Sequence, residues 1–146
     1  MKKIILILII LFTLCSCNNK DNTNNNEKIE VNKMEVNIVN ITINNEVYQI
    51  ELEDNETTKS FLNILPQELN MNELNGNEKY AYLDNTLPTD SYNPKHINKG
   101  DIMLFGNNCL VIFYKSFDTS YSYTKIGHIN NLPDLDNNNI LIKIEK

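Results

Sequence analysis

The sequence predicts a mainly β fold for residues 36–146, a small antiparallel β-barrel, closed or half-closed, with one short capping helix. Short runs rich in β-branched and aromatic residues recur along this segment, and turn-forming Gly, Pro and Asn residues separate them. Helical spacing occurs in one stretch alone. A chain of 146 residues has room for one modest core, so we expect no second domain.

The barrel is expected to begin with a β-hairpin. Residues 36–43 and 46–52 both have strand-like composition, and the second run alternates its side chains between two faces. Asn44 and Asn45 lie between the runs, and asparagine can supply the positive φ angles of a tight turn. The two runs are therefore expected to pair as antiparallel neighbours.

One helix is expected after the hairpin. Asn55 is a suitable N-cap, because its side chain can accept a hydrogen bond from a free amide of the first turn. Pro66 ends the helical pattern. Three apolar residues share a face of this helix: Phe61, Leu62 and Leu65. We expect the helix to cover one open end or one face of the sheet.

The rest of the chain is expected to form strands. Turn signals separate five further runs, at residues 79–83, 100–106, 109–117, 120–129 and 140–145. Two of them contain continuous apolar stretches, at residues 102–105 and 110–113. Such stretches are typical of strands that are buried on both faces, so we expect these two strands to be central.

The N-terminus has the pattern of a bacterial lipoprotein signal. Two lysines precede a largely apolar run over residues 4–14, which is shorter than the about 20 residues of a membrane-spanning helix. The letters LCSC resemble a lipobox, with Leu14 three residues before Cys17 and the small Ser16 directly before it. We expect residues 1–16 to be removed as a signal peptide. An uncleaved or simply secreted signal sequence is the alternative.

A lipid anchor at Cys17 predicts where the protein resides. Cys17 would carry a diacylglycerol, and two acyl chains suffice for stable anchoring, here on the extracytoplasmic side of the cell membrane. Residues 17–35 are polar, rich in Asn and almost free of large apolar side chains. Such a segment cannot bury enough surface to order itself, so it is expected to be a flexible tether.

Composition and cysteine count exclude several functions. The chain has 19 acidic residues against 13 lysines, a formal charge of −6 and no arginine. Nucleic-acid binding requires a clustered basic face, so we expect no nucleic-acid partner. With Cys17 lipidated, Cys109 is the one free thiol of the mature chain, which leaves no intramolecular disulfide. It lies in an apolar run and is expected to pack in the core.

Three blocks carry a resemblance to a known family. The stretches LNMNELNGNEKYAYL, INKGDIMLFGNNCLVIFYKSF and TSYSYTKIGHI resemble the small bacterial cyclophilin-like domains. The resemblance runs from about residue 38 to the C-terminus and implies the cyclophilin β-barrel. It does not by itself imply prolyl isomerase activity, because one fold can carry many functions.

The absence of arginine bears on that activity. True cyclophilins depend on an arginine that reaches the prolyl nitrogen and carbonyl, and lysine cannot copy its planar fork of donors. We therefore expect a non-catalytic module that binds a peptide or a small ligand, or that mediates an interaction. An atypical peptidyl-prolyl cis-trans isomerase or envelope folding factor is the alternative.

A cluster of tyrosines is the candidate binding site. Tyr80 and Tyr82, and likewise Tyr121 and Tyr123, have the i, i+2 spacing of one strand face. If their strands are neighbours, the four rings form a cross-strand ladder. In the functional interpretation the ladder is the platform of a shallow cleft and is flanked by Lys115, Phe117 and Ser120. In the alternative interpretation the rings form a structural wall.

Other chemistry is not expected. His96 and His128 lack the paired spacing of a zinc site and have no cysteine cluster beside them. Glu73 and Asp101 are associated with turns, where carboxylates usually cap amides or face solvent, so we do not expect a catalytic acid pair. Phosphate-binding and dinucleotide-binding glycine motifs are missing. We therefore predict neither a metal nor a cofactor.

Overall fold

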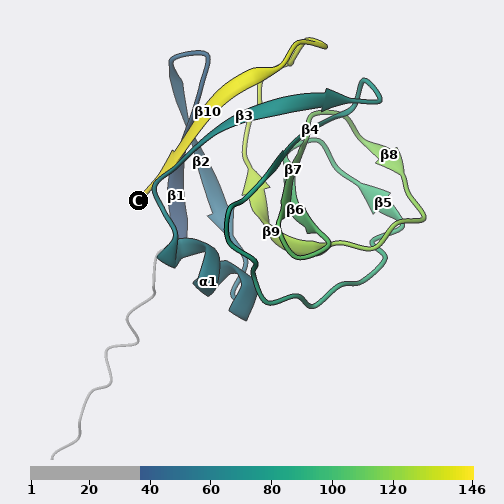
Figure 1. Cartoon of the computed structure of the whole chain (residues 1–146). Helices are drawn as coiled ribbons and strands as arrows, with labels where there is room; N and C mark the ends of the chain where they lie inside the picture. The colour runs from purple at the N-terminus through teal and green to yellow at the C-terminus, as the bar shows by residue number, and fades with distance from the viewer. Residues whose placement is uncertain (1–36) are drawn as a thin grey trace, which may run out of the picture. The chain divides into compact units, whose positions relative to one another are not determined.

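Eight antiparallel strands close into a barrel in the computed structural model, which describes residues 37–146 (Figure 1). The strands follow one another around the barrel in the order β1-β10-β3-β4-β7-β6-β9-β2, and β2 pairs again with β1. Their bounds are β1 (Ile38–Ile43), β2 (Glu46–Leu52), β3 (Gln67–Leu74), β4 (Glu78–Tyr82), β6 (Asp101–Phe105), β7 (Cys109–Phe113), β9 (Thr124–Ile129) and β10 (Ile140–Glu145). The predicted mainly β barrel is confirmed, and it is closed.

The predicted N-terminal segments lie outside the described residues. These segments are the signal peptide at residues 1–16, with its lipidation site at Cys17, and the tether at residues 17–35. Between residues 37 and 146, the structure contains no helix with the length and apolar character needed to cross a membrane.

The hairpin prediction is confirmed. β1 and β2 pair from Ile38 opposite Glu51 to Ile43 opposite Glu46. Asn44 and Asn45 form the turn with φ angles of 51° and 67°. Two successive positive φ values are the signature of a type I′ turn, whose twist matches that of the flanking strands.

The predicted helix and its Asn55 cap are confirmed, but the helix ends at Asn63, so Leu65 lies beyond it. Helix α1 (Glu56–Asn63) lies at one end of the barrel (Figure 1), and the Asn55 side chain accepts a hydrogen bond of 2.8 Å from the Thr58 amide. Asn55 donates from its side-chain amide to the Lys125 carbonyl of β9 at 2.9 Å, so the same residue caps α1 and ties it to the barrel. Phe61 is fully buried in the interior core.

Two hydrophobic layers share the central strands. Side chains that point into the barrel, such as Leu104 and Ile112, belong to the interior core. Their neighbours along the same strands, including Met103 and Val111, point outward into a second buried cluster. β6 and β7 are therefore buried on both faces, as their continuous apolar runs predict.

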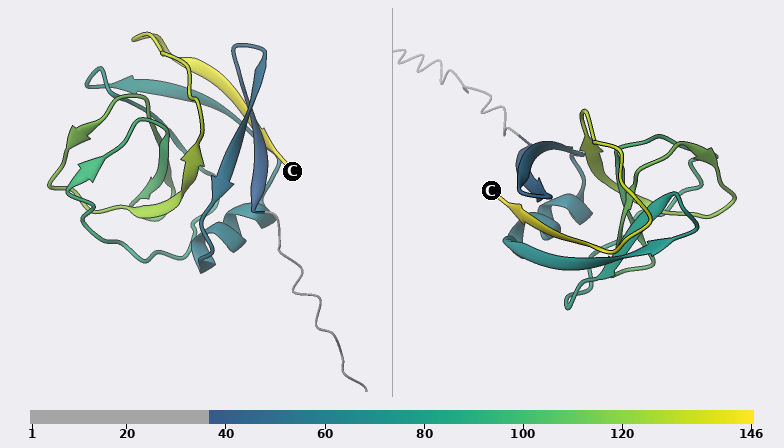
Figure 2. Two further views of the ribbon diagram at one scale, coloured as in Figure 1. Left: turned by 180° about the vertical axis from the view of Figure 1, so that it is seen from behind. Right: turned by 90° about the horizontal axis from the view of Figure 1, so that it is seen from above.

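A small second sheet covers part of this outer cluster. It consists of β5 (His96–Ile97) and β8 (Phe117–Asp118), which lie beside the barrel wall (Figure 2). Ile97 is fully buried, and the Phe117 ring packs 5.7 Å from that of Phe113, centroid to centroid. This small sheet buries part of the outer face of β6 and β7.

Two predictions about strands need correction. β3 is a strand that the sequence did not predict. Its sequence QELNMNEL is mostly polar, and only Leu69 and Met71 are buried apolar residues. Pairing with β10 and β4 makes this segment a strand. The runs at 109–117 and 120–129 are also shorter than predicted. The chain leaves the barrel after Phe113 to form β8, and it rejoins the barrel at Thr124.

Candidate functional site

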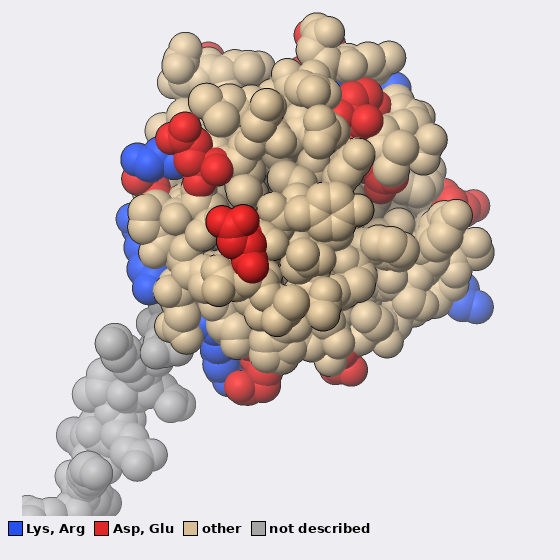
Figure 3. Space-filling view, in the orientation of Figure 1, with Lys and Arg blue, Asp and Glu red and all other residues tan. Residues whose placement is uncertain are grey.

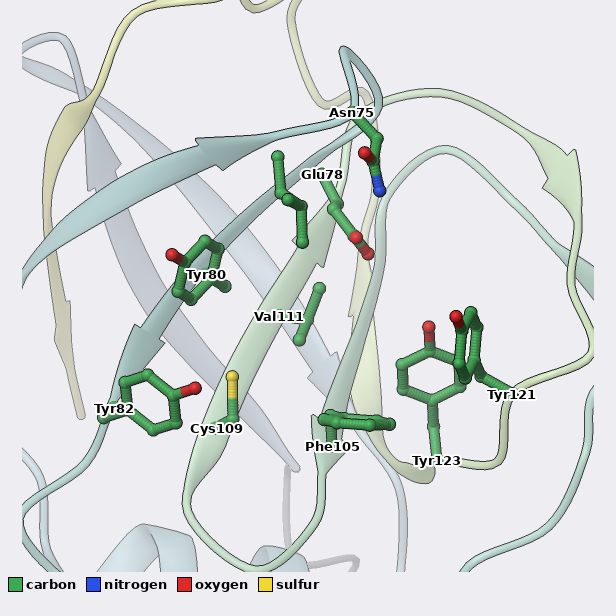
Figure 4. Close-up of a pocket in the computed structure, with 10 residues that line it drawn as sticks. Asn75, Glu78, Tyr80, Tyr82, Phe105, Cys109, Val111, Tyr121 and Tyr123 are labelled. Atoms are coloured by element: carbon green, nitrogen blue, oxygen red, sulfur yellow. The ribbon is translucent and has the colours of Figure 1, made fainter.

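A cavity of about 330 Å³ lies on the outer face of the barrel, where β4, β7 and β6 run side by side (Figure 4). Five of its lining residues are aromatic: Tyr80, Tyr82, Phe105, Tyr121 and Tyr123. The other five are Leu74, Asn75, Glu78, Cys109 and Val111. Its volume is at the lower end of the range of small-molecule pockets.

The aromatic residues form two walls. Tyr80 and Tyr82 point outward from β4, and their rings meet edge to face with centroids 6.1 Å apart. The Phe105 ring, at the end of β6, lies 6.2 Å from that of Tyr121 and 5.7 Å from that of Tyr123. Figure 4 shows these two groups on opposite sides of the cavity. A ligand between them would contact π-systems on both sides.

β7 supplies the floor between the walls. Val111 and Cys109 point outward from this strand and are both buried. Burial, together with the negative charge of Glu78, raises the pKa of the Cys109 thiol. The thiol is therefore protonated at neutral pH, which makes it a poor nucleophile. The prediction that Cys109 is buried among apolar residues is confirmed, and the residue lies in the outer cluster.

Glu78 lies at one end of the cavity. It is the first residue of β4, directly after a turn in which Asn75 and Gly76 have φ angles of 56° and 70°. Strand alternation places it on the same face as Tyr80 and Tyr82, and its carboxylate points into the cavity (Figure 4). Residue 78 is only 9% exposed, and burial with the charge of Glu73 raises the pKa of its carboxyl.

The Glu78 carboxylate has no partner within residues 37–146. Neither a hydrogen bond nor an ion pair joins it to another side chain or to the backbone there. The next residue, Lys79, is fully buried on the opposite face of β4 and is saturated: its ammonium contacts Glu73 at 2.5 Å and the carbonyls of Asp136 and Asn138 at 2.6 Å each. The oxygens of Glu78 are not fully enclosed, because Asn77 Oδ1 is the one fully buried side-chain polar atom without a partner in residues 37–146; the Glu78 carboxylate is open toward the cavity that it lines.

The structure brings the four predicted tyrosines to one cavity, but not as a ladder. β4 pairs with β3 and β7, so the strand that carries Tyr80 and Tyr82 is not a neighbour of β9. Tyr121 lies outside the strands, and Tyr123 forms an isolated bridge with Tyr92 before β9 begins. The predicted cross-strand ladder is therefore wrong, because β7 and β6 separate the two tyrosine pairs.

The three flanking residues lie outside the cavity lining. The Lys115 ammonium is 5.6 Å from the centroid of the Tyr114 ring, and Phe117 packs in β8. The Ser120 carbonyl accepts a hydrogen bond of 2.9 Å from Asn93. The wall interpretation fits Tyr123, which is buried, whereas Tyr82 and Tyr121 are exposed at 66% and 64%. The cluster thus combines a packed base with an open rim.

Sequence reasoning missed six of the ten lining residues. Glu78 carried a usable signal, because the pattern EKYAY places it on the face of Tyr80 and Tyr82. Phe105 and Cys109 carried no such signal. Their strands β6 and β7 are apolar on both faces, so the sequence does not show which side chains point away from the barrel.

The histidines and acidic residues have separate structural partners. His96 Nδ1 lies 2.7 Å from Asp118, and His128 Nδ1 lies 3.1 Å from Asp101. Glu73 accepts instead from Lys79 and Tyr114, so Glu73 and Asp101 do not share a partner. Across residues 37–146, the structure contains no group of three or more His, Cys, Asp or Glu side chains that could hold a metal ion.

Comparison with known proteins agrees with this fold. The sequence model of the cyclophilin-like family matches residues 41–146, which is well over half of the chain. Searches of curated protein sequences and of solved structures gave no match. The matched segment runs from within β1 to the C-terminus and contains every residue that lines the cavity. The chain therefore belongs to the cyclophilin-like family.

Proposed function

We propose that this protein is a lipid-anchored extracytoplasmic binding module whose cyclophilin-like domain holds a small molecule or a peptide side chain in the cavity on β4, β7 and β6. One observation carries the binding role: a concave cavity in which five of ten lining residues are aromatic and one carboxylate, Glu78, has no protein partner within residues 37–146. Apolar concave sites with a few placed polar groups are typical of ligand pockets.

The absence of catalytic groups supports a binding role over catalysis. The chain has no arginine to polarise a prolyl amide, and the Cys109 thiol has a raised pKa. Both histidines pair with carboxylates of their own and neither lines the cavity. Among the residues that the structure describes, the cavity lining provides apolar and aromatic surface and one carboxylate, and it contains no nucleophile with an adjacent base.

Binding can be tested on the purified full-length protein in a non-ionic detergent. A library of small neutral, cationic and anionic compounds and short Xaa-Pro peptides is screened by ligand-observed NMR. We expect hits whose affinity falls at least about tenfold in Tyr121→Ala, whose ring forms part of the rim. Val47→Ala is the matched control, because Val47 is 65% exposed, as Tyr121 is at 64%, and does not line the cavity.

The same protein decides between binding and isomerisation. A prolyl cis-trans isomerisation assay on the Xaa-Pro peptides should give the uncatalysed rate. An acceleration that disappears in Tyr121→Ala would overturn the non-catalytic part of the proposal. A library without a single hit at the cavity would overturn the binding part.

Anchoring is tested separately. In a bacterial host that processes lipoproteins, the wild-type chain should fractionate with membranes and show the mass of an acylated Cys17. Cys17→Ala should lose the acyl mass, whereas Cys15→Ala should keep it. Acylation that persists in Cys17→Ala would contradict the assignment.

A further inference from the structure

Glu78 stands out among the buried polar residues of residues 37–146. The other five are Thr57, Thr58, Lys79, Asp101 and Thr124, and each of them has a hydrogen-bond partner. The Glu78 carboxylate has none in this part of the chain, although residue 78 is only 9% exposed. The residue is largely buried, but its carboxylate oxygens remain accessible from the cavity, so this charge is available to pair with a ligand there.

The surroundings of this carboxylate favour a cation. The cavity is lined by the rings of four tyrosines and one phenylalanine, and the faces of such rings attract positive charge. No lysine of residues 37–146 lines the cavity, and the chain has no arginine. A ligand with positive charge would therefore meet the carboxylate and the rings without competition from a cation that the described part of the chain places in the lining.

The net charge of the domain also favours a cationic ligand. Residues 37–146 contain eight lysines and fifteen acidic residues. On the face shown in Figure 3, acidic side chains are scattered across the surface and the visible basic ones lie toward its margin. Such a distribution raises the local concentration of cations and disfavours anionic ligands.

We propose that the cavity binds an organic ammonium group, a protonated amine or its methylated form on a short aliphatic stem, with the Glu78 carboxylate as counter-ion and the tyrosine and phenylalanine rings around its alkyl groups. This inference rests on the proposed function, that the cavity is a binding site. Two sources share the chemistry: a free small amine, and a lysine side chain of a peptide or protein.

The volume of the cavity limits the size of the group. A cavity of about 330 Å³ is at the lower end of the ligand-pocket range. It suits an ammonium head with a few carbon atoms better than a multi-ring compound. Leu74 and Val111 add apolar surface for an aliphatic stem.

Choline and its uncharged carbon analogue 3,3-dimethylbutan-1-ol form the first pair of probes. They have nearly the same shape and differ in charge, so their comparison isolates the role of the carboxylate. Isothermal titration calorimetry on the full-length protein should show choline binding at least about tenfold more tightly than the analogue, because the ionic contact with the carboxylate and the cation–π contacts with the rings are open to choline alone.

A matched pair of variants tests the residue. Glu78→Gln keeps the shape and removes the charge, and we expect choline affinity to fall about tenfold or more while that of the neutral analogue changes less than twofold. Glu68→Gln removes the same charge from β3 at an exposed position outside the cavity lining, and it should leave both affinities unchanged. The wild-type comparison of the two probes is decisive even without the variants.

A third arm uses pH, because choline keeps its charge at all pH values. The pKa of Glu78 is raised, so choline affinity should fall as the pH is lowered through that raised pKa and the carboxylate is neutralised. Glu73 is the other acid whose charge acts on Glu78. The Cys109 thiol and the Tyr123 phenol face it from β7 and from the segment before β9, and their raised pKa values keep them neutral. Tyr80, Tyr82 and Tyr121 complete the ionisable lining.

The outcomes separate the two levels of the proposal. Equal affinity for choline and its neutral analogue, or an unchanged affinity in Glu78→Gln, overturns the ammonium inference and leaves the cavity as a ligand site. Failure of every probe and of the whole library overturns the proposed function itself. Tighter binding of Nα-acetyl-lysine methylamide than of choline, lost on Nε-acetylation, supports a lysine side chain as the source; the reverse order supports a free amine.

Discussion

Glu78 and Lys79 are adjacent charged residues on β4, and they differ in whether the protein supplies a partner for the charge. Lys79 points into the barrel and donates to three acceptors, which uses all three of its protons. Glu78 points outward into the cavity and has no partner within residues 37–146. A saturated buried charge stabilises a fold, whereas an unsaturated one leaves binding capacity for a ligand.

The Lys79 site joins three separated parts of the chain. Glu73 lies on β3, and the two carbonyls belong to Asp136 and Asn138 in the segment before β10. Glu73 also accepts from the Tyr114 hydroxyl at 2.9 Å and from the Gly76 amide at 2.6 Å. Burial and the Glu73 carboxylate raise the pKa of Tyr114 to about 12, so its hydroxyl remains a donor.

The largest expected effect is on this network. Lys79→Met keeps a long apolar stem and removes the ammonium, so the Asp136 and Asn138 carbonyls lose this donor and the Glu73 carboxylate loses its counter-ion. We expect unfolding in urea to show a loss of about 3–5 kcal/mol, the usual cost of breaking a buried ion pair. Lys143→Met, whose lysine is half-exposed on β10, is the control and should change stability by less than about 0.5 kcal/mol. A loss below about 1 kcal/mol for Lys79→Met would refute the importance of the network.

The second effect concerns Glu73 and depends on pH. Burial alone would raise its pKa, but hydrogen bonds from Lys79, Tyr114 and the Gly76 amide outweigh burial and lower it. Glu73 therefore stabilises the fold above the unfolded-state pKa of about 4.3, and this contribution is lost as the pH falls through the lower folded-state value. Glu73→Gln should cost about 2 kcal/mol at pH 7. Urea unfolding between pH 3 and pH 7 should show the difference from wild type shrinking toward acid.

The third effect concerns Glu78, whose replacement should raise stability at neutral pH, whereas replacement of Glu73 should lower it. The pKa of Glu78 is raised by burial and by Glu73, so the wild-type protein loses stability as the pH rises through this raised value. Glu78→Gln removes the unpaired charge and should stabilise the protein at pH 7 by on the order of 1 kcal/mol. In the same unfolding series the gain should grow from pH 4 to pH 7. A destabilised variant at pH 7 would mean that the carboxylate has a structural partner.

The smallest effect is at the rim of the cavity. The Tyr121 ring is 64% exposed and forms a T-shaped pair with the Phe105 ring, so Tyr121→Ala should change the free energy of unfolding by less than about 0.5 kcal/mol. Its effect should instead be seen in ligand affinity. A large loss of stability would favour the wall interpretation of the tyrosine cluster.

The sequence allowed much of the fold to be predicted where local chemistry decides it. Asn44 and Asn45 set the first turn, Asn55 caps the helix, and continuous apolar runs mark β6 and β7. β3 could not be predicted in this way, because its strand character comes from pairing with β10 and β4 rather than from its own composition.

The site was predictable to a lesser degree. The i, i+2 spacing of the tyrosines was visible, and the structure does gather them at one cavity. Their arrangement depends on β7 and β6 lying between the two pairs, which no local pattern encodes. The lack of a partner for Glu78 is a property of the whole surroundings, so only the folded chain reveals it.

Closure of the barrel has a consequence for recognition. Each of the eight barrel strands has a hydrogen-bonded neighbour on both sides, so this wall offers no free main-chain edge to which a peptide could add as a further strand. Selectivity at the cavity must then come from the residues that line it and not from strand addition. Residues such as Tyr82 and Tyr121, which contribute to the rim and little to the core, can be exchanged to alter what is recognised while the frame stays the same.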